Sequence, residues 1–237
     1  MKQMANLLII PLLFNAVTAA ALADAPLRDK TLVVWAAPAN LEQRGGSALT
    51  LDAGQGRFDG IIFGEHTPRK WMPGSEGWRR THREQEVWPD ETADGKTSVQ
   101  IAIVYQDQQV TIYRNGKQYA QYTMVNPPQG FGSQSAVLLG KRHLDQGEDG
   151  RFAGAIDDAR IYDRALTAEQ IAALKPNEAS DIKPWAWWTF DDKNVKDRSG
   201  RFKVAKLTGG AVVADGKLVL DDPYFEQVMR AGSPAPA

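Results

Sequence analysis

Apolar and polar residues alternate in short runs along most of the chain, and turn residues separate one run from the next. The strongest of these signals extends from Val99 to Tyr105. Short strands at this spacing are typical of a β-sandwich or jelly roll. The runs that predict strands cover residues 31–36, 47–51, 58–63, 99–105, 110–113, 118–123, 136–140, 155–162, 185–190, 204–207, 217–220 and 224–228.

Two local signals add detail to this all-β pattern. Asn115-Gly116 lies between two of the runs, and this dipeptide favours the tight turn of a β-hairpin. Thr167 and Gln170 have the spacing of a capping box, in which each residue caps the other's backbone. We therefore expect one short helix over residues 167–174.

The first residues resemble an export signal. A charged start precedes the apolar run Leu7–Phe14 and a small-residue site that ends at Ala23. Pro11 and Asn15 interrupt the run, which is shorter than the roughly 20 apolar residues that a membrane span needs. We expect cleavage near Ala23, a secreted or periplasmic location and no membrane span. Residues 1–23 are thus set apart as a signal peptide, and residues 229–237 have the composition of a linker.

Charge and composition narrow the possible partners. The 237 residues include 28 Lys and Arg against 29 Asp and Glu, so the chain lacks the basic excess that binding to nucleic acid requires. Hydrophobic residues make up 43% of the chain, which is enough for a core. No cysteine is present, so the fold must depend on core burial and not on disulfides.

Two stretches resemble a known family. Residues 152–171, from Phe152-Ala153-Gly154 to Ile171, follow the pattern F-x-G-x-I-D-D-x-R-I-Y-x-R-x-L-s-x-x-x-I. This pattern closes the laminin-G-like, concanavalin A-like jelly rolls of secreted bacterial proteins. Residues 110–119 resemble the same family's hairpin. The resemblance implies an all-β fold, a concanavalin-like jelly-roll sandwich of two sheets, over residues 30–228.

The order of the family's motifs is unusual in this chain. The motif of the usual first strand appears last, from Trp188-Thr189-Phe190-Asp191 to Gly210, and the usual second part begins at Thr31. Either residues 181–228 begin a truncated second copy, or one domain is circularly permuted and these residues supply its first strands. The permuted domain leaves fewer sheet edges exposed, and we favour it. The arrangement also resembles modules that precede invertase- or levanase-like glycoside hydrolases.

Catalysis has little support in the sequence. Glycoside hydrolysis usually needs two carboxylates that flank the scissile bond, and jelly-roll glucanases often carry them as E-x-D-x-E. The chain has no such run, and we expect it not to be an enzyme. A carboxylate pair near Glu84, Glu86 and Asp90 is the remaining catalytic hypothesis.

A turn-rich stretch combines large aromatic residues with arginines. Flat aromatic faces and planar hydrogen-bonding groups are what a sugar-binding site needs, although tryptophans more often serve packing. Trp35, Trp185, Trp187 and Trp188 lie in predicted strands and are expected in the core, with one of the last two pointing outward. The candidate ligand-binding residues are Trp71, Trp78, Arg79, Arg80, His82 and Trp88.

The resemblance also implies one structural calcium ion, held where the first and last strands meet. Calcium prefers several carboxylate and carbonyl oxygens. The candidate ligands are Asp157, Asp191 and Asp197; for Asp157, salt bridging or turn capping is the competing interpretation.

These observations favour a secreted, non-catalytic carbohydrate-binding or adhesion module whose partner is a glycan or polysaccharide. A protein-interaction scaffold is the alternative, because this type of fold does not by itself decide the ligand. A truncated, non-catalytic part of a glycoside hydrolase is a further alternative.

Overall fold

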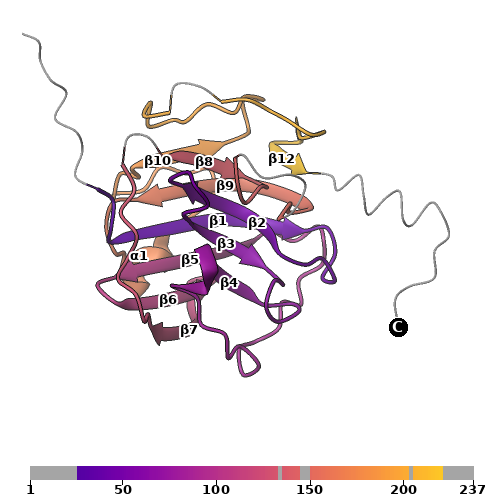
Figure 1. The fold of residues 1–237 in the computed structure, drawn as a ribbon. Coiled ribbons are helices and arrows are strands. Elements are labelled where there is room, and N and C mark those ends of the chain that lie inside the picture. The colour runs from indigo at the N-terminus through magenta and orange to yellow at the C-terminus, as the bar shows by residue number, and fades with distance from the viewer. Residues whose placement is uncertain (1–25, 133–134, 145–149, 203–204, 221–237) are drawn as a thin grey trace, which may run out of the picture.

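The computed structural model describes residues 26–132, 135–144, 150–202 and 205–220. Two antiparallel sheets face each other and form a sandwich (Figure 1). The predicted signal peptide, the linker-like tail and the predicted strand at 224–228 lie outside the described residues.

The larger sheet has the strand order β11-β12-β9-β1-β5-β6-β7, with β10 also paired to β9, and the smaller has the order β4-β3-β2-β8. This architecture confirms the prediction of a two-sheet jelly-roll sandwich. The strands of the larger sheet are β1 (Lys30–Pro38), β5 (Val99–Gln106), β6 (Gln109–Arg114), β7 (Lys117–Thr123), β9 (Gly154–Tyr162), β10 (Ala186–Thr189), β11 (Val212–Ala214) and β12 (Lys217–Leu220). Those of the smaller sheet are β2 (Gly46–Asp52), β3 (Phe58–Phe63), β4 (Trp71–Ser75) and β8 (Ala136–Leu139).

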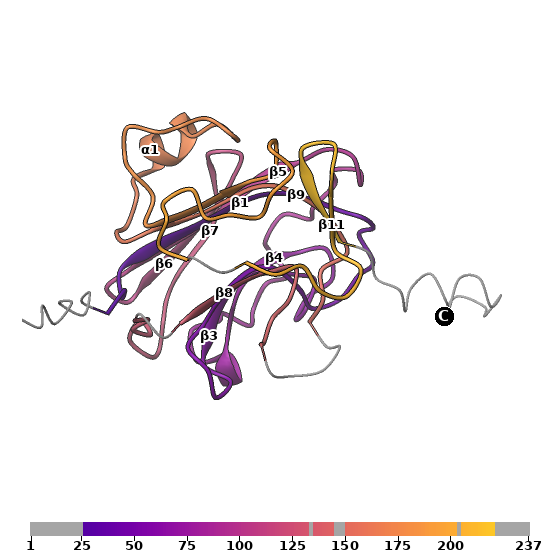
Figure 2. The same cartoon turned by 90° about the horizontal axis from the view of Figure 1, so that it is seen from above.

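The larger sheet buries side chains on both of its faces. Leu32 and Val34 of β1 point into the sandwich, whereas Val33 and Trp35 belong to a second apolar cluster. The helix α1 (Ala168–Ala173) contributes to that cluster and lies on the outer side of the larger sheet, as Figure 2 shows. Its predicted capping box is present. Alternate side chains of β1 therefore pack into two different apolar clusters, one inside the sandwich and one on the outer face of the larger sheet.

The carboxy-terminal strands pair in the same sheet as β1. β9 is bonded along one side to β1 and along the other to both β10 and β12. β10 lies beside residues 158–161 of β9, and β12 lies beside residues 154–156. β10, β12 and the residue that follows β10 deliver buried apolar side chains to the main core, namely Trp188, Phe190, Leu218 and Leu220. That the chain folds as one permuted domain over residues 30–228 stays a prediction, which this pairing supports.

Two strands escape the sequence pattern, and one predicted strand is absent. β4 contains Pro73 and Gly74, which normally interrupt strands. A side chain at Gly74 would clash with the Ile62 side chain, so any larger residue would force Ile62 to move. β11 is three residues long. Residues 205–207 do not form a strand, and they lead into Gly209 and Gly210, both of which have positive φ.

A buried ion pair lies on the outer face of β9. Nε and Nη2 of Arg160 each donate to the carboxylate of Asp158 at 2.8 Å, and both side chains are excluded from solvent. The Arg160 guanidinium also lies over the rings of Trp35 and Trp187, 5.2 and 4.8 Å from their centroids. Trp187 thus points outward and its neighbour Trp188 inward, as the sequence predicts for adjacent strand residues.

The long connection between β4 and β5 is held to the sandwich by Glu91. This buried carboxylate accepts hydrogen bonds from the Trp71 indole at 2.8 Å and from Nη2 of Arg114 at 2.6 Å. Burial alone would raise the pKa of Glu91, but the bonds from Arg114, the Ala93 backbone and Trp71 together lower it below its usual value. Glu91 is therefore ionised near neutral pH.

Within the described ranges, no helix is both long enough and apolar enough to cross a membrane.

Candidate functional site

Trp71 and Arg80 of the predicted sugar-binding stretch are buried. Trp71 has no exposed surface, and its ring centroid lies 4.8 Å from that of Phe63 in the core. Arg80 is 3% exposed and donates to Asp59 at 2.7 Å and to Glu76 at 2.6 Å. Neither side chain presents a face on which a sugar could stack.

Trp88 and His82 form an aromatic stack with Tyr122 of β7. The His82 ring lies 5.2 Å from that of Tyr122 and 6.0 Å from that of Trp88, both in stacked orientation. Trp88 is 8% exposed. The hydroxyl of Tyr122 donates to the backbone carbonyl of Arg80 at 2.7 Å. The stack therefore fastens the β4–β5 connection to the edge of the larger sheet.

Trp78 and Arg79, like His82, are not fully buried. Trp78 is half-buried at the end of the short helix η1 (Glu76–Trp78), with φ of 61°, a strained value for a bulky residue. Its ring contacts His66, with 5.3 Å between centroids. The Arg79 side chain is exposed.

The structure does not bring the three predicted calcium ligands together. No group of three or more His, Asp or Glu side chains suited to a metal occurs in the described part of the chain. Asp197 instead accepts hydrogen bonds from the backbone of Trp187, Ser199, Arg201 and Phe202. Asp157 accepts one from Asn177, and Asp191 is exposed. Because protein donors already occupy the oxygens of Asp197, these residues do not fit a calcium site.

The three carboxylates of the catalytic hypothesis lie on the surface. Glu84, Glu86 and Asp90 are all exposed on the β4–β5 connection, and Asp90 is paired with Lys70. They do not face each other across either of the two cavities described below.

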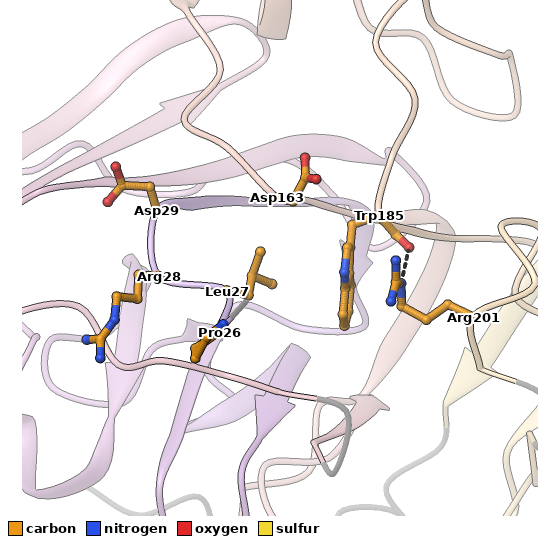
Figure 3. Close-up of a pocket in the computed structure, with 7 residues that line it drawn as sticks. All are labelled: Pro26, Leu27, Arg28, Asp29, Asp163, Trp185 and Arg201. Carbon is orange, nitrogen blue, oxygen red and sulfur yellow. Dashed lines mark hydrogen bonds between the residues drawn. The ribbon is translucent and has the colours of Figure 1, made fainter. Parts of the chain in front are cut away.

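A cavity of about 430 Å³ opens at one end of the sandwich. Figure 3 shows the Trp185 ring edge-on, with Arg201 on one side and Leu27 on the other. The lining comes from three distant parts of the chain: the segment before β1, the residue after β9 and the segment around β10. The residues that line the cavity are Pro26, Leu27, Arg28, Asp29, Asp163, Trp185 and Arg201.

Backbone pairing fixes the walls of this cavity. The N–H of Trp185 donates to the carbonyl of Ile161 in β9 at 2.7 Å. Leu27 and Phe131 exchange two backbone hydrogen bonds of 2.7 and 3.1 Å. The guanidinium of Arg201 lies 4.5 Å from the centroid of the Trp185 ring, a cation–π distance. Arg201 thus lies over the indole, Phe202 packs against the same ring with 5.5 Å between centroids, and the ring also lines the cavity.

The cavity combines an aromatic face with a balanced set of charged groups. Asp29 and Asp163 can accept hydrogen bonds, and Arg28 and Arg201 can donate them. Asp163 is exposed, and its Oδ1 accepts a hydrogen bond from Nε of Arg164 at 3.0 Å. Its other carboxylate oxygen accepts none from the residues that the structure describes. An apolar ring face bordered by such groups can hold a molecule that has both C–H surfaces and hydroxyls.

A second cavity of about 440 Å³ adjoins the first, and the two share Pro26 and Arg28. Its charged lining consists of Arg28, Arg79, Arg80 and Glu76, and the segment 126–130 forms another wall. Arg79 and Arg80 are therefore the two predicted site residues that border one of these two cavities.

Sequence reasoning placed Trp185 in the core and so missed the first cavity. The residue does pack against the main core and against Phe202, as the sequence predicts, but its ring is half-buried and also lines the cavity. The only sequence signal for this cavity was the order of the family motifs, which implied that the two ends of the chain meet.

Comparison with known families gives one match. The model of the concanavalin A-like lectin/glucanases superfamily matches residues 14–172, which is more than half of the chain. No curated protein matches the sequence.

Solved structures share the fold at low sequence identity. A candidate carbohydrate binding protein from Bacteroides ovatus aligns with a TM-score of 0.57 and 16% identity, over 76% of this chain and 53% of that one. This chain thus spans about half the length of that protein. Domain 4 of the arabinanase AbnA from Geobacillus stearothermophilus, solved with arabinotriose, aligns at 0.46 and 19%, over 61% and 65%. The CBM40 of a Ruminococcus gnavus sialidase, bound to sialyllactose, aligns at 0.45 and 15%, over 62% and 83%.

Proposed function

The chain belongs to the superfamily of concanavalin A-like lectins and glucanases, and we propose that within it the protein is a secreted carbohydrate-binding module without catalytic activity. The Bacteroides protein with the same fold is a candidate carbohydrate binding protein. Fold alone does not assign a ligand, so the proposal depends on the site.

The observation that carries the proposal is the cavity at Trp185. The Trp185 ring lines the cavity, and the Arg201 guanidinium lies 4.5 Å from its centroid. A sugar ring has one relatively apolar face of C–H groups, which can lie on the indole, and hydroxyls at its rim. Asp29, Asp163 and Arg28 surround that position with acceptors and donors. We therefore assign the cavity as the glycan-binding site.

Replacing Trp185 by alanine is expected to weaken glycan binding on the order of tenfold. Roughly 60 Å² of ring face at about 25 cal/mol per Å² corresponds to roughly 1.5 kcal/mol, which is about a factor of ten in affinity. Binding is measured on a glycan array and by retention on insoluble polysaccharides. Circular dichroism and thermal unfolding show whether the variant is folded.

Two further variants keep the test decisive. Asp163→Asn removes an exposed acceptor charge at nearly constant volume, so it should weaken binding without changing the unfolding temperature. Trp78→Ala removes a half-buried tryptophan that lines neither cavity and should bind as the parent does. Loss of binding in Trp78→Ala alone would move the site to the stretch that the sequence favoured. Absence of binding to every glycan would refute the proposed function.

A further inference from the structure

We infer that the ligand is an acidic oligosaccharide, whose anionic group lies in the second cavity between Arg28 and Arg79 while a neighbouring sugar lies on Trp185. This inference rests on the proposed function and names the ligand class more closely. It follows from the charge of the second cavity and from its position beside the first.

The charge of the second cavity is not compensated by its own carboxylates. Beneath it, buried Lys30 pairs with Asp59 at 2.8 Å, and Arg80 bridges Asp59 and Glu76. Burial lowers the pKa of Lys30, although the nearby Asp59 opposes this shift. The two carboxylates are thus committed to Lys30 and Arg80.

Arg28 and Arg79 carry the remaining positive charge. Both side chains are exposed, and neither forms an ion pair with any residue that the structure describes. Nη1 of Arg28 reaches the carbonyl of Pro128 at 3.4 Å, which leaves its other donors available. Two guanidinium groups on one cavity suit a carboxylate or a sulfate, because their planar N–H pairs match these groups.

The wall formed by residues 126–130 is held in place before any ligand binds. Nδ2 of Asn126 donates to the carbonyl of Arg79 at 3.1 Å, and Lys30 donates to the carbonyl of Gln129 at 3.3 Å. Preorganised walls reduce the ordering cost of binding. The cavity is therefore a built feature of this end of the sandwich.

The two cavities differ in charge and meet at a common border. The first has Asp29 and Asp163 against Arg28 and Arg201, whereas the second has three arginines against Glu76. Because Arg28 lines both, a ligand of two or more sugar units can occupy the two cavities together. The neutral sugar of such a ligand would bind at Trp185, and its anionic group would bind in the second cavity, beyond Arg28.

The test compares acidic saccharides with their neutral forms. Oligogalacturonates are measured against their carboxyl-reduced forms, and dextran sulfate against dextran, on one array and then by calorimetry. We expect the acidic member of at least one pair to bind about tenfold more tightly, and the difference to shrink at high salt. The galacturonate pair reports a carboxylate ligand and the dextran pair a sulfate ligand.

Substitution of Arg79 locates the effect. Arg79→Gln should weaken binding of the acidic member about tenfold and leave the neutral member unchanged. Arg83→Gln is the matched control, because Arg83 is also exposed but lines neither cavity. Equal binding of the acidic and neutral members, or equal losses of binding in the two arginine variants, would overturn the inference. The proposed function would still stand in that case if Trp185→Ala lost glycan binding. If no saccharide bound at all, both would fail.

Discussion

A chain that ends at Ser180 is expected to lose the cooperative unfolding of the full protein. The truncation removes β10 and β12, which cover the side of β9 opposite to β1. It also removes Trp188 and Phe190, which are 5% and 0% exposed. Loss of one such aromatic side chain costs about 3–5 kcal/mol, and a domain has only about 5–15 kcal/mol in total. Near-ultraviolet circular dichroism and thermal scans measure the outcome.

Point variants in the full chain show whether the loss of stability comes from the missing core side chains or from a nonspecific effect of truncation. In the full chain, Phe190→Ala should lower the free energy of unfolding by about 3–5 kcal/mol. Val212→Ala, at an exposed position of β11, should change it by about 0.5 kcal/mol or less. If residues 181–228 belonged to a second copy, Phe190→Ala would shift a separate transition, and the shortened chain would unfold as sharply as the parent.

Replacement of Asp158 by alanine is expected to destabilise the protein by about 3–5 kcal/mol. The carboxylate holds Arg160 in a place without solvent, and removal of one partner leaves the other charge buried and unpaired. Arg160 cannot easily turn away, because it lies between Trp35 and Trp187. The Asp158 carboxylate also accepts hydrogen bonds from the Asn177 backbone at 2.7 Å and from the Trp187 indole at 3.0 Å.

Urea denaturation measures this loss. Asp192→Ala, a change at an exposed carboxylate, is the control and should leave the midpoint within error. A loss below about 1 kcal/mol in Asp158→Ala would mean that Arg160 finds another partner or reaches water, contrary to the contacts of the folded protein.

The fold was largely predictable because its strands carry local signals. The run from Val99 to Tyr105, the turn at Asn115-Gly116 and the capping box at Thr167 each depend on neighbours in sequence, and each predicted the observed element. β4 was missed because Gly74 avoids a clash with the side chain of Ile62 in the adjacent strand, which its own neighbours in sequence do not reveal. Such a requirement is tertiary and leaves no local pattern.

The candidate site was harder to predict, for a related reason. Trp71, Trp78 and Trp88 are close in sequence, yet their environments differ. Trp71 packs in the buried core, Trp78 lies in a strained turn, and Trp88 stacks on Tyr122 at the edge of the larger sheet. The cavity at Trp185 joins residues from both ends of the chain, so its chemistry exists only after the sheet has formed. Predicting it would require the register of β10 against β9, which sequence alone does not provide.

The central claim is that the carboxy-terminal segment completes the sandwich and thereby forms a glycan site at Trp185. The most direct measurement is an NMR titration of the tryptophan indole N–H resonances with the array's tightest ligand. Trp185→Phe and Trp78→Phe assign the two relevant signals. The account predicts that the Trp185 resonance shifts in proportion to saturation while that of Trp78 stays in place. A shift at Trp78 or Trp88 with an unchanged Trp185 signal would contradict it.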